Sequence, residues 1–162
     1  MPFEGMPAQI ARALASELEG RGVATHVEEP VQLPSAAYDA ARGQFRADSL
    51  LSLLSGYRRH VLGITHRDLF AGELNFVFGI ASAAGACLVS TARLVGGADD
   101  ALFLARLLKE AVHELGHTLG LPHCADPDCV MHFSNSLADT DRKGDAYCGA
   151  CRARLHVRRP LR

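Results

Sequence analysis

The sequence lacks long apolar stretches, a strong charge of either sign and internal repeats. No segment approaches the roughly eighteen consecutive apolar residues of a transmembrane helix, so we expect no membrane partner. The formal net charge is −1, which provides no overall field to attract nucleic acid or an anionic membrane. A chain of 162 residues without repeats is long enough for one domain with its own core.

A secretory signal is also missing from the first twenty residues. Charged and polar side chains interrupt the apolar positions there, and no basic segment precedes a hydrophobic one. We therefore expect a cytoplasmic protein.

Cysteine is scarce except near the C-terminal end, where Cys124, Cys129, Cys148 and Cys151 cluster. In an oxidising compartment four cysteines could form two disulfides in three alternative pairings. In a reducing compartment, clustered thiols that include a C-x-x-C pair favour a metal site. We adopt the metal interpretation and expect Cys87, which stands apart, to be an inert buried thiol.

The periodicity of apolar residues predicts an α/β protein. We expect helices at 7–20, 49–57 and 99–119, strands at 23–27, 60–65, 74–80 and 86–94, and turns at 68–72 and 82–85. Residues 1–120 would form an upper subdomain that includes the long helix 99–119. Residues 121–162 have few consecutive apolar positions and would form a small irregular lower subdomain that needs a crosslink or a metal to hold its shape. Together they make one domain, 1–162.

The longest predicted helix carries an H-E-x-x-H motif, with His113 and His117 four residues apart. This spacing places both imidazoles on one helix face, one turn apart, where both can bind a single zinc ion. Glu114 lies beside the first ligand, so its carboxylate can contact water on the metal without being a ligand itself. The motif predicts a zinc site with Glu114 as the general base. It makes 99–119 the active-site helix and 1–162 a single catalytic domain.

The motif continues through Gly120 to His123. A third histidine reaches the same ion only if the chain reverses at once, which requires a residue that tolerates positive φ, and Gly120 is such a residue. Three neutral imidazoles leave the fourth zinc position open, as in catalytic rather than structural sites.

The whole pattern resembles that of the archaemetzincins, a family of metzincin zinc metalloproteases. The resemblance includes Cys124 directly after His123, Met131 eight residues past His123, the later Cys148-x-x-Cys151 pair, and the upstream segments 77–81 and 89–94. It implies a metzincin-like fold with a twisted mixed sheet and a methionine turn at Met131. It also implies a second, structural zinc held by the four cysteines, giving two zinc ions per chain.

Metzincins bind an extended peptide along an edge strand, and we expect residues 86–90 to play that role here. Some members place a tyrosine two residues after the methionine, where it stabilises the reacting oxygen. This chain has Phe133 there, so the electrophilic partner stays unassigned among Arg142, Lys143, His132 and Tyr147.

The expected partner is a peptide or protein substrate, with no nucleic acid, and we expect a monomer. The main alternative is a zinc-bearing peptide-binding module with little turnover. A zinc-ribbon nucleic-acid module built on the four cysteines ranks last. The arginine-rich end, residues 151–162, has no interleaved aromatic residues, and we expect it to be solvated or disordered.

Overall fold

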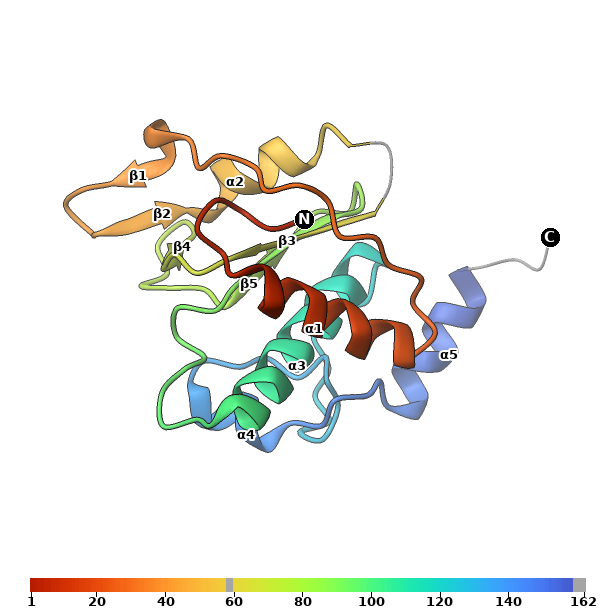
Figure 1. Ribbon diagram of the computed structural model, residues 1–162. Coiled ribbons are helices and arrows are strands. Elements are labelled where there is room, and N and C mark those ends of the chain that lie inside the picture. The colour runs from red at the N-terminus through yellow and green to blue at the C-terminus, as the bar shows by residue number, and fades with distance from the viewer. Residues whose placement is uncertain (58–59, 159–162) are drawn as a thin grey trace.

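Two three-stranded sheets and five α-helices make up the fold in the computed structural model, which describes residues 1–57 and 60–158 (Figure 1). The larger sheet has the order β3-β6-β5, with β3 (Val61–Thr65) parallel and β5 (Gly79–Ala81) antiparallel to β6 (Ala86–Ser90). The smaller sheet joins β1 (Tyr38–Asp39), β2 (Gln44–Arg46) and β4 (Leu69–Phe70). Both sheets mix parallel and antiparallel pairs, as predicted for this fold class.

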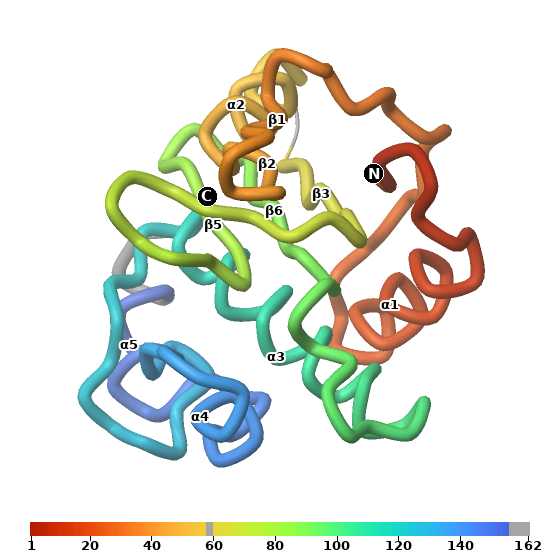
Figure 2. The backbone as a smooth tube through the Cα atoms, turned by 90° about the vertical axis from the view of Figure 1, so that its left-hand side faces the viewer, coloured from red at the N-terminus to blue at the C-terminus, as the bar shows by residue number. Residues whose placement is uncertain are grey.

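The larger sheet lies between helices on its two faces. On one face, α2 (Ala47–Leu54) contributes to an apolar cluster that includes Leu88 of β6. On the other, α3 (Asp100–Thr118) forms a second cluster with Val89 of β6 and with α1 (Ala8–Gly20). Figure 2 shows α1 on one side of α3 and the C-terminal helices on the other. The sheet thereby fixes the position of α3.

Helices α1 and α3 follow their sequence signals closely. In α1, Ala11, Leu14 and Leu18 are buried and repeat at helical spacing. At the start of α3, the Asp99 side chain accepts a hydrogen bond of 2.8 Å from the Leu102 N–H, which caps the helix. Apolar spacing therefore predicts α1, and apolar spacing together with the Asp99 cap predicts α3.

Residues beyond α3 contain more regular structure than the sequence indicates. A short helix α4 (Leu137–Arg142) begins after Ser136, whose side chain accepts from the Asp139 N–H, and α5 (Gly149–Arg158) follows the second cysteine pair. Two helices therefore lie within the segment that was expected to be irregular. Of the end that was expected to be solvated or disordered, residues 151–158 belong to α5, and Arg152, Ala153 and Arg154 are exposed there. The part of that prediction covering residues 159–162 lies outside the described residues.

Two expected strands and one expected turn differ from the structure. Residues 23–27 form no strand, and Val23 and Val27 are exposed. Of the expected strand 74–80, only Gly79 and Ile80 belong to β5, because side chains of Arg42 and Gln44 bind the carbonyls of Leu74 and Asn75 in place of a neighbouring strand. The expected turn at 68–72 contains β4.

Strand β6 is not an edge strand, which corrects the expected substrate strand at residues 86–90. It lies between β3 and β5, and all five of its residues are buried. A central strand that is covered on both faces has a nearly continuous apolar sequence. Such a sequence does not indicate which strands pair with it, so its central position could not be predicted.

Within the part of the chain described, no helix is long and apolar enough to cross a membrane.

Candidate active site

Helix α3 carries two of the three histidines at its C-terminal end. The Nε2 atoms of His113 and His117 are 3.1 Å apart, close to the separation of about 3.3 Å between two nitrogens of a tetrahedral zinc site. The helix stops after Thr118, and Gly120 has a φ of 83°, as its place in the motif predicts. This reversal brings His123 back toward the helix.

The three histidines meet at one point. The ligand-capable nitrogens of His113, His117 and His123 all lie within 4.8 Å of one another. His113 is buried and His123 is exposed, so the cluster opens to solvent on one side. Such an arrangement can hold a metal ion and leave it accessible.

Backbone carbonyls fix the tautomers of the two helix histidines. The Nδ1 atoms of His113 and His117 each lie 2.8 Å from a carbonyl oxygen, of Val130 and Leu121 respectively. Because a carbonyl only accepts, each Nδ1 carries the proton and each Nε2 keeps its lone pair for a metal. Burial lowers the pKa of His113 to about 3, helped by the charge of Lys143, and this favours the neutral ligand form.

Glu114 is 5% exposed and lies between α3 and the larger sheet. Burial raises the pKa of its carboxyl well above the usual value, and the charge of Glu110 raises it further, while Lys143 acts in the opposite direction. A carboxyl in such surroundings can take up a proton at moderate pH and release it again.

Met131 lies directly beneath the histidine-bearing turn of α3. Its side chain is fully buried and occupies the space that a side chain on Gly116, the residue before His117, would need. The Met131 carbonyl accepts a hydrogen bond of 2.9 Å from the Cys124 N–H. The residue therefore packs against the helix and ties down the segment that follows His123.

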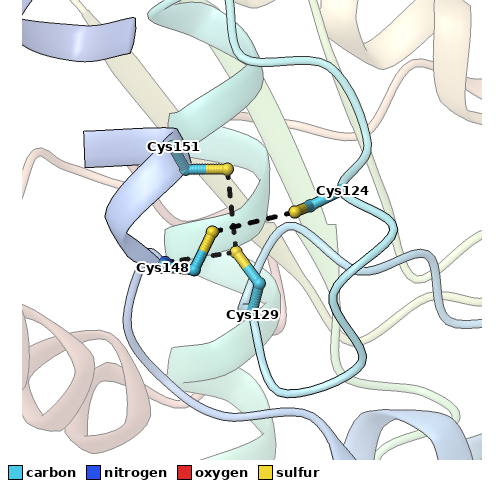
Figure 3. Close-up of side chains that lie close together, drawn as sticks. All are labelled: Cys124, Cys129, Cys148 and Cys151. Carbon is cyan, nitrogen blue, oxygen red and sulfur yellow. Dashed lines mark hydrogen bonds between the residues drawn. The ribbon is translucent and has the colours of Figure 1, made fainter. Parts of the chain in front are cut away.

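The four clustered cysteines bring their sulfurs together on the other side of this segment (Figure 3). The Sγ atoms of Cys124 and Cys148 are 3.8 Å apart, and those of Cys129 and Cys151 are 3.7 Å apart. These separations far exceed a disulfide bond of about 2.05 Å but match the edge of about 3.8 Å in a tetrahedral zinc–thiolate site.

Hydrogen bonding favours the thiolate form at Cys148, whereas burial raises the pKa of the Cys129 and Cys151 thiols. The backbone N–H of Cys151 lowers the pKa of Cys148 to about 7. A thiolate near neutral pH is ready to bind a metal, and four converging cysteine sulfurs are a donor set that fits zinc in geometry. Cys87 lies apart in β6, where burial raises the pKa of its thiol.

A cleft of about 520 Å³ runs above the three histidines. The helix side of the cleft contributes the histidines and Glu114, and the opposite side consists mainly of the segment leading into β5 and of β5 itself. Its further lining residues are Ala71, Leu74, Phe76, Val77, Phe78, Gly79, Ile80, Ala81, Glu110, Phe133, Ser134 and Asn135.

The four candidates for the electrophilic partner lie elsewhere. Tyr147 donates to the Val112 carbonyl, His132 bonds the Cys124 carbonyl through Nδ1, Arg142 pairs with Asp139, and Lys143 is buried against Glu110. None of these four described side chains lines the cleft. Phe133 does line it, with its ring 5.0 Å from that of His123.

Sequence reasoning missed a buried polar cluster one turn before the motif. Glu110 accepts a hydrogen bond of 2.9 Å from Thr140, and its carboxylate lies 3.1 Å from the Lys143 ammonium. The two charged residues come from segments more than thirty positions apart, so no local signal connects them. Gly79 was also missed, although an isolated glycine in a β-prone run often marks a close backbone approach.

Comparisons with known proteins identify the family of this chain. The sequence profile of peptidase family M54 matches residues 27–157. An archaemetzincin of Pyrococcus furiosus is 41% identical over 175 residues, covering 98% of this chain and 91% of the relative.

Solved structures give the same result. The crystal structure of archaemetzincin from Methanopyrus kandleri has a TM-score of 0.87 at 40% identity, covering 97% of this chain and 91% of that one. A zinc-dependent peptidase from Methanocorpusculum labreanum has a TM-score of 0.85 at 29% identity, covering 95% and 97%. The chain therefore belongs to peptidase family M54, together with the archaemetzincins, and it is a zinc metallopeptidase.

Proposed function

We propose that this peptidase holds its catalytic zinc through His113, His117 and His123 and uses Glu114 as the general base. The observation that supports this best is the convergence of three imidazoles in an open cleft that a buried carboxyl also lines. Three protein ligands leave one metal position for water or substrate, which is typical of catalytic zinc.

When bound, zinc supplies a more acidic water and polarises the carbonyl of the substrate. Glu114 accepts the proton of the attacking water and then donates it to the nitrogen of the leaving amine. One peptide bond and one water thereby become a carboxylic acid and an amine, which at neutral pH are the carboxylate and the ammonium group. The raised pKa of Glu114 suits a carboxyl that must both accept and donate a proton.

We infer that the substrate binds in extended form along β5. This strand lines the cleft and pairs with β6 on one edge, and no described strand pairs with its other edge. A peptide can add to such an edge through backbone hydrogen bonds, which provide affinity that does not depend on the amino-acid sequence of the peptide. The strand at Gly79–Ala81 thus replaces residues 86–90 as the candidate substrate strand.

We further propose a second zinc, held by Cys124, Cys129, Cys148 and Cys151. The sulfur separations of 3.7 and 3.8 Å support a closed, structural site. In this interpretation residues 1–120 and 121–162 are the upper and lower parts of one metzincin-type catalytic domain. Gly120 supplies the chain reversal between the two parts, and Met131 supplies the methionine turn.

The free thiols of this chain also indicate the kind of cellular compartment in which the protein works. All five cysteines lack disulfide partners, and a thiolate zinc site requires reduced sulfur. We therefore propose that the protein works in a reducing compartment, which agrees with the expected cytoplasmic location. Mass spectrometry of the protein isolated under alkylating conditions would reveal disulfides if this is wrong.

The competing function is peptide binding with little turnover. It is favoured by one observation, namely that Phe133 offers no hydrogen-bond donor at the position next to His123. Against it stands the buried Glu114, because a binder has no use for a general base.

Cleavage of a diverse peptide library by the zinc-loaded protein separates the two functions. The control is Glu114→Ala, with the zinc content of both proteins measured. We expect cleavage by the parent alone, at equal zinc content. Peptides that bind the parent but stay intact would favour the binding module.

A further inference from the structure

Gly79 faces Glu114 across the interface between β5 and α3, and it lines the cleft. We propose that Gly79 is a positioning residue for the Glu114 carboxylate: the absence of a side chain at residue 79 provides the space in which the base is held. The proposal builds on the proposed function, in which Glu114 is the general base.

The available space explains why this residue is glycine. A Cβ at residue 79 would lie 2.6 Å from both Cγ and Oε1 of Glu114, and 2.7 Å from the carbonyl oxygen of Leu88. Cβ atoms in proteins essentially never approach other heavy atoms this closely. Gly79 is not among the glycines with positive φ, so backbone conformation alone would allow another residue.

The two neighbours of that Cβ differ in their freedom to move. Leu88 belongs to β6, and the β5–β6 ladder fixes its carbonyl, with Ile80 opposite Leu88 and Gly79 opposite Val89. Glu114 is a side chain with rotatable bonds. A methyl group at residue 79 would therefore displace the carboxylate first, away from its place in the cleft that it lines together with the three histidines.

Packing gives the carboxylate its position. Within residues 1–57 and 60–158 no hydrogen bond joins the Glu114 side chain to another residue, whereas the Nδ1 atoms of His113 and His117 bind the carbonyls of Val130 and Leu121. Glu114 is confined between its own helix and the backbone of β5. A displacement of a catalytic group by about 1 Å can reduce the catalytic rate by about a hundredfold. We therefore expect this confinement of the Glu114 carboxylate to affect kcat.

Gly63 on β3 provides a matched control within the same sheet. A Cβ there would lie 2.5 Å from Cδ1 of Leu54, 3.0 Å from Cδ1 of Leu88 and 3.2 Å from Cε2 of Phe3. The crowding resembles that at Gly79, but every neighbour is an apolar core side chain. Gly63→Ala therefore measures the cost of overpacking this sheet without involving the base.

The test combines Gly79→Ala and Gly63→Ala with the parent and with Glu114→Ala. For each chain we would measure Tm, zinc content and, on a peptide that the parent cleaves, kcat and KM. We expect Gly79→Ala to reduce kcat by about a hundredfold at unchanged zinc content and with KM within about threefold of the parent. Gly63→Ala should lower Tm but keep kcat within about twofold.

Stability provides a readout independent of turnover. Gly79→Ala should lower Tm by on the order of 5 °C in the parent and by clearly less in the Glu114→Ala background, where the Glu114 side chain no longer occupies that space. The Tm loss of Gly63→Ala should be the same in both backgrounds.

Two results would overturn the inference: an equal Tm loss from Gly79→Ala in both backgrounds, or a kcat within about twofold of the parent. A large rise in KM with unchanged kcat would also contradict it, because it would assign Gly79 to substrate binding. If the parent cleaves no peptide, the proposed function fails, and the Tm comparison still decides whether residue 79 and Glu114 share this space.

Discussion

His123 and Cys124 are adjacent in the chain, yet their side chains belong to two different clusters. His123 completes the group of three histidines, and Cys124 is one of the four converging sulfurs. One peptide bond therefore joins the two candidate metal sites. The Cys124 N–H also donates to the Met131 carbonyl, so the same short segment is tied to the turn beneath α3. We therefore expect that a well-ordered cysteine cluster is needed to hold His123 in place beside His113 and His117.

Cys148→Ser should loosen the chain beyond α3 and weaken zinc binding at the histidines. Metal binding at such a site is worth about 10–16 kcal/mol in isolated peptides, so losing a ligand removes most of the order of this segment. Limited proteolysis followed by mass spectrometry should reveal new cleavage sites beyond Leu121.

Cys87→Ala is the matched control, since this cysteine is buried in β6 outside the cluster. It should leave the C-terminal segment as resistant as in the parent. Equal resistance of the parent and of Cys148→Ser would mean that the four cysteines do not hold this region together.

Gly116→Ala should destabilise the protein although alanine is the better helix former. Alanine inside a helix normally gains about 1 kcal/mol over glycine, but here the new methyl group would collide with the Met131 side chain. We expect a net loss of about 1–3 kcal/mol in the free energy of unfolding. Chemical denaturation of the single and double variants with Met131→Ala would check this, and strictly additive losses would argue against the contact.

Lys143→Met should be strongly destabilising, because it leaves the Glu110 carboxylate buried without its cation. The two side chains are almost completely buried and 3.1 Å apart. Breaking one partner of such a pair costs about 3–5 kcal/mol, whereas replacing both is often tolerated. The double variant Lys143→Met with Glu110→Gln should therefore be more stable than Lys143→Met alone, as urea unfolding can show. A double variant that is less stable would contradict this.

The ion pair between Arg106 and Asp141 should make the contact between α3 and α4 sensitive to acid. The two side chains form paired hydrogen bonds of 2.6 and 2.7 Å, which lower the pKa of Asp141. Because the folded pKa lies below the unfolded value, the stabilisation is present above about pH 4 and is lost as the pH falls through the folded pKa. Asp141→Asn should lower Tm at neutral pH, and this difference should shrink with acidification. A difference independent of pH would exclude the charge as its cause.

The sequence predicted the elements whose causes are local. The α1 and α3 helices follow from apolar spacing and from the Asp99 cap, and the chain reversal follows from Gly120. The grouping of the histidines was predictable for the same reason, since the motif is helix geometry plus one turn. The cysteine cluster was suggested by composition, because clustered thiols without apolar neighbours need a partner.

Features that depend on contacts between segments far apart in the sequence could not be predicted from local sequence signals. The two- and three-residue strands β1, β2 and β4 are defined by their pairing rather than by their own patterns. The central place of β6 depends on strand order, and the pairing of Glu110 with Lys143 depends on how α4 docks on α3. The short segment after Tyr147 becomes the helix α5 once Cys148 and Cys151 are brought to the other two cysteines.

The most direct test of the account is the activity of Glu114→Gln on a peptide that the parent cleaves, with zinc content measured on the same samples. Glutamine keeps the shape of the side chain but cannot accept the proton of water. We expect kcat/KM to fall by about a hundredfold or more, while zinc content and Tm stay close to those of the parent. Full cleavage by the zinc-loaded variant would show that Glu114 is not the base.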